Sequence, residues 1–290
     1  MKTIVAGCKL LFVGLLFSPT FIPAWSMVGS LFLHDDSAKE FHRTPLGVRF
    51  GLLGNKQSFP APTVFFFATS IDQSLNTSGL STDARLLRFL IKRGVLCVSL
   101  DLPCHGSDAR QEEPKELYGW AARMRKGEDF LPRFVKNLSA VLDYLIKEGY
   151  ADRRRIGAAG SSRGGFIALH FAAAEPRVKC IATFAPVTHL PALSEFAGMQ
   201  NHELAKSRSV INLVNSLTGR DVWIAIGNND RRVDTDYCVA FTRQLVQAAT
   251  ANRQTAKVEL HVLPVDDHAC CPSYAEEAAR WILGNIGSHQ

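Results

Sequence analysis

The sequence predicts an α/β domain with a mostly parallel, twisted sheet and helices on both faces. Short runs of strand length alternate along the chain with longer segments of helical periodicity. Those short runs are apolar at nearly every position, which is typical of parallel strands covered on both faces. With 47% hydrophobic and 21% charged residues, the composition is that of an ordinary globular protein and argues against a fibrous or disordered chain.

The first half of the domain shows the alternation clearly. Residues 63–68 and 95–100 are apolar runs of strand length, and residues 81–93 between them have helical spacing. Gly94 ends that helix. Parts of residues 48–53 are expected to form an antiparallel hairpin at the sheet edge.

The second half continues the pattern. Residues 128–149 predict the clearest helix, because their apolar residues recur every three or four positions. The further expected strands are 156–159, 178–184, 222–226 and 257–263, and the further expected helices are 163–174, 235–249 and 274–286.

Residues 185–220 are less regular and are expected to form a short cap insertion near the site. Two interpretations of their apolar residues stay open, an acyl pocket or the core packing of a cap helix; these residues are Leu190, Leu193, Phe196 and Met199. The segment from Cys104 to Arg125 is interpreted as a loop that is a second candidate for covering the site.

The N-terminus predicts a signal peptide at residues 1–26, which leaves 27–290 as the domain. Lys2 and Lys9 accompany an apolar run at 10–17, and residues 24–26 have the small-x-small pattern of a cleavage site. We therefore expect a secreted or periplasmic protein with no stable membrane span after cleavage. A membrane anchor is the alternative.

Cysteine usage leaves the disulfides open. Six cysteines would follow the cleavage site, and Cys97 and Cys180 lie in apolar runs that favour buried free thiols. A bridge from Cys238 to Cys270 or Cys271 is one hypothesis. No cysteine pair has the spacing of a zinc site, so no metal is expected.

The charge balance gives little sign of a nucleic-acid partner. Without the two N-terminal lysines the chain has 31 basic and 27 acidic residues, a net charge of +4. The densest basic run, residues 153–155, is interpreted as a solvated loop before a strand. The expected partner is a small molecule, and nothing in the sequence specifies an oligomeric state.

The strongest motif follows the strand at 156–159. Residues 160–165, Gly-Ser-Ser-Arg-Gly-Gly, fit G-x-S-x-G with Ser162 at the centre and a small-residue helix behind it. In this motif the serine lies on a tight strand-to-helix turn that exposes its hydroxyl above the sheet. Ser162 is therefore the predicted nucleophile, and Ser161 has the wrong spacing.

Two later loops supply an acid and a base. Asp230 follows the strand at 222–226, with Asp234 as the fallback, and His268 follows the strand at 257–263. In parallel sheets the loops after the strands gather at one edge. The order Ser162, Asp230, His268 is the chain order of a nucleophile, an orienting acid and a general base on such a sheet.

Backbone amides are the expected oxyanion donors. One N–H should come from Arg163, the residue after the nucleophile, and another from Thr69 or Ser70 after the first core strand. An anion-stabilising loop of this kind needs no organic cofactor.

These residues, with Asp101-Leu102-Pro103-Cys104-His105-Gly106-Ser107-Asp108, resemble the α/β-hydrolase superfamily over roughly residues 45–287. Within it, the chain is similar to dienelactone-hydrolase and prolyl-oligopeptidase-like serine esterases. The resemblance implies cleavage of a carboxylic ester through an acyl-enzyme. The alternatives are a thioesterase, acyltransferase or small-peptide hydrolase with the same triad, or a non-catalytic binding module of this fold.

Overall fold

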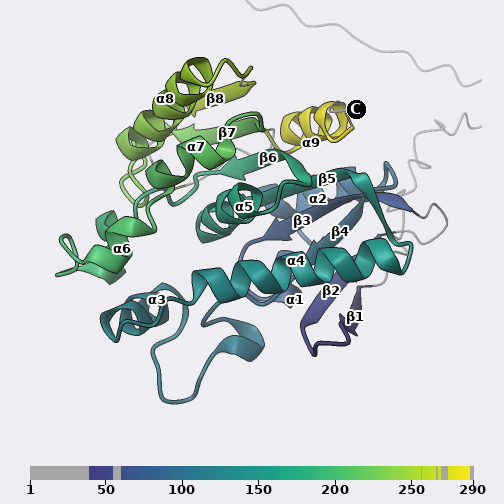
Figure 1. Cartoon of the computed structure of the whole chain (residues 1–290), viewed down its shortest axis with the longest axis horizontal. Helices are drawn as coiled ribbons and strands as arrows, with labels where there is room; N and C mark the ends of the chain where they lie inside the picture. Colours follow the sequence, from purple (N-terminus) through teal and green to yellow (C-terminus); the bar gives the residue numbers. More distant parts are fainter. Residues whose placement is uncertain (1–38, 55–59, 256, 266, 269–273, 288–290) are drawn as a thin grey trace, which may run out of the picture. The chain divides into compact units, whose positions relative to one another are not determined.

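The computed structural model describes residues 39–54, 60–255, 257–265, 267–268 and 274–287 (Figure 1). The expectations for residues 1–26, for Cys270 and for Cys271 lie outside this part of the chain. None of the helices in the described part is both long and apolar enough to cross a membrane.

The described strands form one sheet in the order β1-β2-β4-β3-β5-β6-β7-β8 (Figure 1). β1 and β2 make the expected antiparallel hairpin at one edge, β2 pairs with β4 antiparallel, and every later pairing is parallel. The strands are β1 (Glu40–Arg43), β2 (Arg49–Leu53), β3 (Ala61–Phe67), β4 (Leu96–Ser99), β5 (Ala151–Ser161), β6 (Val178–Phe184), β7 (Asp221–Gly227) and β8 (Val258–Leu263).

Helices cover both faces of this sheet. Buried side chains of α3, α4, α5 and α8 belong to one core cluster, and those of α1, α2 and α9 belong to a second. The predicted mostly parallel α/β architecture is therefore confirmed. The α-helices are α1 (Ile71–Ser74), α2 (Thr82–Ile91), α3 (Glu116–Arg125), α4 (Leu131–Lys147), α5 (Arg163–Ala174), α6 (Glu203–Ser207), α7 (Val214–Leu217), α8 (Thr235–Ala251) and α9 (Tyr274–Asn285).

The helix that follows Ser162 is buried along nearly its whole length. Gly164, Gly165, Ala168 and Ala172 of α5 have almost no exposed surface, and α5 contacts β3, β5 and β6. Small side chains let a helix approach a sheet closely, and β5 lies between β3 and β6 near the middle of the strand order. The turn after β5 therefore lies near the middle of the edge formed by the carboxyl ends of the parallel strands.

Two expectations about loops were wrong. The segment 104–125 is not loop throughout, because α3 forms at Glu116–Arg125 and buries Leu117, Trp120 and Met124. The basic run 153–155 lies inside β5 rather than in a loop, although Arg153 and Arg154 are exposed.

The expected cap segment, 185–220, contains only short helices. Besides α6 and α7 these are 3₁₀ turns at Leu190–Ala192, Ser194–Phe196 and Val210–Leu213. Of the two interpretations of its apolar residues, core packing is confirmed, since all four belong to the core cluster with at most 2% of their surface exposed; these are Leu190, Leu193, Phe196 and Met199.

Candidate active site

Ser162 lies on a strained turn between β5 and α5. Its φ angle is +53°, a region that non-glycine residues seldom adopt. The Ser162 N–H donates to the Phe184 carbonyl over 2.8 Å, and the Ser162 carbonyl accepts from the Val187 N–H over 3.1 Å. Strain of this kind persists only where the surroundings hold it, and here the last residue of β6 and the segment just after it hold the two sides of Ser162.

The glycines of the motif are required by the close approach of β3. A Cβ on Gly164 would lie 1.8 Å from the Phe67 carbonyl oxygen, and one on Gly160 would lie 2.7 Å from the same atom. Real Cβ atoms essentially never come within 3.0 Å of a heavy atom outside their own and the adjacent residues. The spacing of the motif therefore reflects the packing of the turn against the end of β3.

Asp230 and His268 meet above the end of β7. Nδ1 of His268 lies 2.8 Å from Oδ2 of Asp230, whose side chain is fully buried, while a quarter of the His268 side chain is exposed. A carboxylate can only accept here, so Nδ1 carries the proton and Nε2 keeps its lone pair. That tautomer is the one a general base needs.

The second oxygen of Asp230 is also satisfied. Oδ1 accepts the N–H groups of Arg232 over 2.9 Å and Val233 over 3.2 Å. Burial raises the pKa of Asp230, but the hydrogen bonds from His268 and these two amides outweigh it and hold the pKa below its ordinary value. Asp234, the fallback acid, instead caps α8 by accepting from the N–H groups of Asp236 and Tyr237.

Ser162 and His268 line one cavity of about 190 Å³. Although both residues belong to the described part, no hydrogen bond joins them. Catalytic hydrogen bonds often tighten only when substrate binds, so the shared cavity is the observation that links the two residues. The rest of the lining is Ser81, Thr82, Asp83, Ser161, Phe184 and Ala185.

The backbone N–H groups expected to bind an oxyanion differ in whether they already donate a hydrogen bond. The Arg163 N–H, at the start of α5, has no acceptor within the described chain. The Thr69 N–H donates to Oγ of Ser74 over 3.1 Å, as does the Ala68 N–H over 3.0 Å. The Ser70 N–H, by contrast, has no acceptor among the described residues. Of the two alternatives in this loop, Ser70 therefore has the free donor.

Asp101 connects the loop after β3 to the loop after β4 by hydrogen bonds. Oδ1 of Asp101 accepts the Ile71 N–H over 2.8 Å, and Oδ2 accepts the N–H and the hydroxyl of Ser107 and the guanidinium of Arg49. Despite burial, these donors hold the pKa of Asp101 below its ordinary value. Cys104 has a φ of +62°, a conformation that glycine adopts without strain.

The side chain of Arg163 is occupied within the protein. Nη1 of Arg163 lies 2.6 Å from Oε2 of Glu116 and 2.8 Å from Nε2 of His105. Nδ1 of His105 in turn donates to the Pro103 carbonyl over 2.8 Å, which leaves Nε2 as an acceptor. The guanidinium therefore fixes the loop before α3 to the start of α5.

Sequence reasoning missed Asp83 and Ser161 as site residues. The Ser161 hydroxyl donates to Oδ1 of Asp83, and both line the cavity that contains Ser162. An acidic residue in the first turn of a helix is so common that the sequence carries no signal for this contact.

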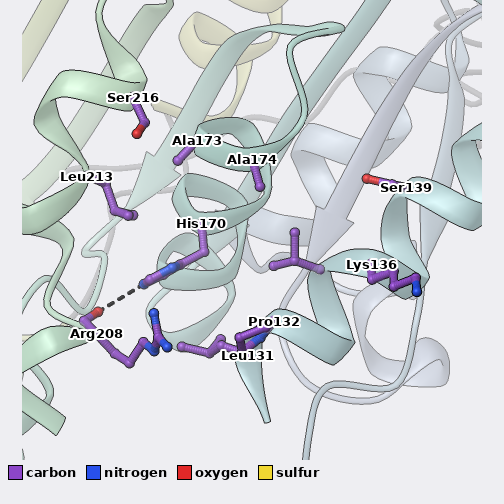
Figure 2. Close-up of a pocket in the computed structure, with 11 residues that line it drawn as sticks. Leu131, Pro132, Lys136, Ser139, His170, Ala173, Ala174, Arg208, Leu213 and Ser216 are labelled. Atoms are coloured by element: carbon purple, nitrogen blue, oxygen red, sulfur yellow. Dashed lines mark hydrogen bonds between the residues drawn. The ribbon is translucent and has the colours of Figure 1, made fainter. Parts of the chain in front are cut away.

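A larger cavity of about 500 Å³ lies between α4, α5 and the segment 208–216 (Figure 2). Its lining contains none of the predicted catalytic residues. In Figure 2 the imidazole of His170 points at the Arg208 carbonyl, which it contacts over 2.9 Å. Neither cavity holds a metal-binding set, since no cluster of three or more His, Cys, Asp or Glu suited to a metal occurs among the described residues.

The four cysteines in the described part are buried and form no disulfide bond there, and they are Cys97, Cys104, Cys180 and Cys238. The expectation for Cys97 and Cys180 is confirmed. Cys238 lies on α8, and burial raises its pKa to about 12, which disfavours the reactive thiolate form. Its hypothesised partners Cys270 and Cys271 lie outside the described residues, so the bridge stays a prediction.

Comparison with known structures finds the same fold in several solved proteins. A provisionally assigned dienelactone hydrolase from Klebsiella pneumoniae subsp. pneumoniae MGH 78578 is 18% identical, with a TM-score of 0.59 over 87% of this chain and 100% of that one. Acetyl xylan esterase 1 from Thermoanaerobacterium sp. JW/SL YS485 is 16% identical, with a TM-score of 0.57 over 86% and 88%. These similarities establish the fold.

Some of the matching structures are much longer than this chain. Dipeptidyl peptidase 4 from Porphyromonas gingivalis is 14% identical, with a TM-score of 0.60 over 86% of this chain but 36% of that one. The chain thus spans about a third of the length of such relatives. No curated protein sequence matches it.

A family model settles the wider relationship. The model of the prolyl oligopeptidase family matches residues 116–284, more than half of the chain, and includes Ser162, Asp230 and His268. The chain belongs to the prolyl oligopeptidase family, a group of serine hydrolases within the α/β-hydrolase superfamily.

Proposed function

We propose that this protein cleaves carboxylic esters of small molecules through an acyl-enzyme on Ser162. One observation carries the proposal. A serine held at positive φ shares a small cavity with an imidazole whose Nδ1 is fixed by a buried carboxylate. A strained nucleophile, a base in the required tautomer and a desolvated acid together are what acyl transfer requires.

The proposed reaction begins at the Ser162 hydroxyl. Nε2 of His268 takes its proton as the oxygen attacks the ester carbonyl, and Asp230 stabilises the resulting imidazolium. The N–H groups of Arg163 and Ser70 bind the developing oxyanion, and the Thr69 N–H joins them if Ser74 releases it. The imidazolium then protonates the leaving alcohol, and a water activated by His268 hydrolyses the acyl-enzyme.

The test is the loss of the nucleophile. We expect Ser162→Ala to lower kcat for p-nitrophenyl butanoate by a factor on the order of 10⁶, as for other catalytic serines. A fluorophosphonate probe should label the wild type and not this variant. Ser207→Ala, at an exposed serine on α6, is the matched control and should keep both signals. Undiminished turnover in Ser162→Ala would end the proposal.

Peptide hydrolysis is the second candidate, supported by the family match and by the dipeptidyl peptidase structures. The same residues would attack an amide, with His268 protonating the leaving amine. Matched ester and anilide substrates with one acyl group separate the two activities. An anilide rate comparable to the ester rate would favour the peptidase.

We also retain the proposal that the chain is exported, which the sequence of residues 1–26 supports. Mass spectrometry of the mature N-terminus in the native host tests it. A retained Met1 would contradict cleavage.

A further inference from the structure

Asp83 places a carboxylate beside the candidate nucleophile. It lies in the first turn of α2 and lines the same cavity as Ser162 and His268. Asp83 is partly exposed and lines this cavity, so a molecule bound in the cavity can reach its carboxylate.

Helix capping does not account for Asp83. The cap of α2 is Ser81, whose Oγ accepts the Ala84 N–H over 3.2 Å. The Asp83 carboxylate instead accepts a hydrogen bond from the hydroxyl of Ser161, the last residue of β5 and the neighbour of the nucleophile. The carboxylate is thus directed from α2 toward the nucleophile turn.

This carboxylate has no counter-charge in the described chain. No lysine, arginine or histidine there forms an ion pair with Asp83. Burial raises the pKa of Asp83, and the hydrogen bond from Ser161 only partly offsets it, with no charged neighbour contributing. An acidic group in such surroundings is stabilised as an anion when a cation comes close to it.

We infer that Asp83 determines specificity, by selecting substrates with a positively charged nitrogen a few bonds from the scissile carbonyl. The inference rests on the proposed function, because it assigns the substrate class of the same cavity. An ammonium group of a substrate bound in this cavity would pair with the Asp83 carboxylate. That ion pair would compensate the ammonium group for the water that it loses on binding.

The size of the site limits where that charge can be. The cavity volume of about 190 Å³ is below the roughly 300–1,000 Å³ of sites for drug-sized ligands, so a short substrate fits it. Ser161 and Ser162 are consecutive, with Cα atoms about 3.8 Å apart. The cation therefore belongs near the reacting carbonyl rather than at the far end of a long chain.

Two isosteric substrate pairs test the inference on either side of the ester. In the first, p-nitrophenyl 3-aminopropanoate is compared with p-nitrophenyl butanoate, where a methyl group replaces the ammonium. In the second, acetylcholine is compared with 3,3-dimethylbutyl acetate. The quantity measured is the ratio of kcat/KM for the charged and neutral members of each pair.

We expect the wild type to favour the charged member of at least one pair. Asp83→Asn should reduce that ratio by about 10- to 100-fold, since hydrogen bonds between charged groups are stronger than neutral ones. Asp83→Glu, which keeps the charge, should retain part of it. Asp236→Asn is the matched control, because Asp236 has the same position in α8 as Asp83 in α2 but is exposed and outside this cavity.

Equal ratios in the wild type and Asp83→Asn would overturn the inference, as would a wild type that favours the neutral member of both pairs. If no ester is hydrolysed at all, the proposed function fails, and binding decides the role of Asp83. Propylammonium chloride should then raise the Tm of the wild type more than 1-propanol with matched KCl does. The same response in Asp83→Asn would overturn the inference independently of turnover.

Discussion

His170 should make this protein lose stability as the pH falls through the mildly acidic range. The imidazole lies on α5, with its ring centroid 4.4 Å from that of Phe166. Burial lowers the pKa of His170 to about 4, and the nearby charge of Arg208 adds to the effect, although the hydrogen bond to the Arg208 carbonyl opposes it (Figure 2). An unfolded histidine has a pKa of about 6.5.

The sign follows from these two pKa values. Above about pH 6.5 neither state binds the proton, so His170 adds no pH dependence there. Between about pH 6.5 and about pH 4 only the unfolded chain is protonated, and the free energy of unfolding falls as the pH falls. Since one pKa unit corresponds to about 1.36 kcal/mol, the loss reaches about 2 kcal/mol at about pH 5 and about 3 kcal/mol below about pH 4.

His170→Gln isolates this contribution. The glutamine amide can donate to the Arg208 carbonyl in place of Nε2 but cannot take up the proton. We expect the difference in unfolding free energy between the variant and the wild type to shift by about 2 kcal/mol in favour of the variant from about pH 7 to about pH 5. Urea unfolding at both pH values measures it, and carboxylates that titrate in this range cancel in the comparison. Parallel pH curves for the two proteins would refute the reasoning.

Two further predictions concern the nucleophile turn and the acid. Asp230→Asn should lower kcat by a factor of about 10⁴ with the Tm little changed, because the amide no longer enforces the tautomer of His268; ester turnover within tenfold of wild type would contradict the assignment. Gly164→Ala should destabilise the fold by about 3 kcal/mol or more, because its Cβ would overlap the Phe67 carbonyl oxygen. Gly284→Ala, with open space around the new Cβ, is its control and should not destabilise; equal Tm values for the two variants would contradict the packing argument.

The bounds of an element were predicted correctly where its own residues specify it. The helix at 163–174 and the strand at 178–184 have the same bounds in the sequence analysis and in the structure. Each is set by its own residues, small side chains for the buried helix and an apolar run for the buried strand. The signal for α3 was also local, since Leu117, Trp120, Ala121 and Met124 have helical spacing, although the segment was interpreted as a loop.

β5 shows where local reasoning stops. Its basic residues read as a loop, yet the strand begins at Ala151, which pairs with Ala61 of β3. A register shift follows before Thr63 pairs with Ile156, so the basic residues belong to a bulged strand end whose side chains reach solvent. Pairing with a distant strand fixed this structure, and the composition of the segment does not reveal it.

The pairing of Asp230 with His268 was predictable because both residues directly follow parallel strands. Strands β7 and β8 are parallel neighbours in the sheet, so the loops after them lie close together at its carboxyl edge. The contact of Asp83 with Ser161 has a different origin. It joins the first turn of a helix to the end of a strand 78 residues away, and it depends on how α2 packs on the sheet. The strand order therefore brings the proposed acid and base together, whereas the position of Asp83 depends on helix packing. Substitution of Asp83, rather than of the proposed triad, is thus the change that should alter substrate preference.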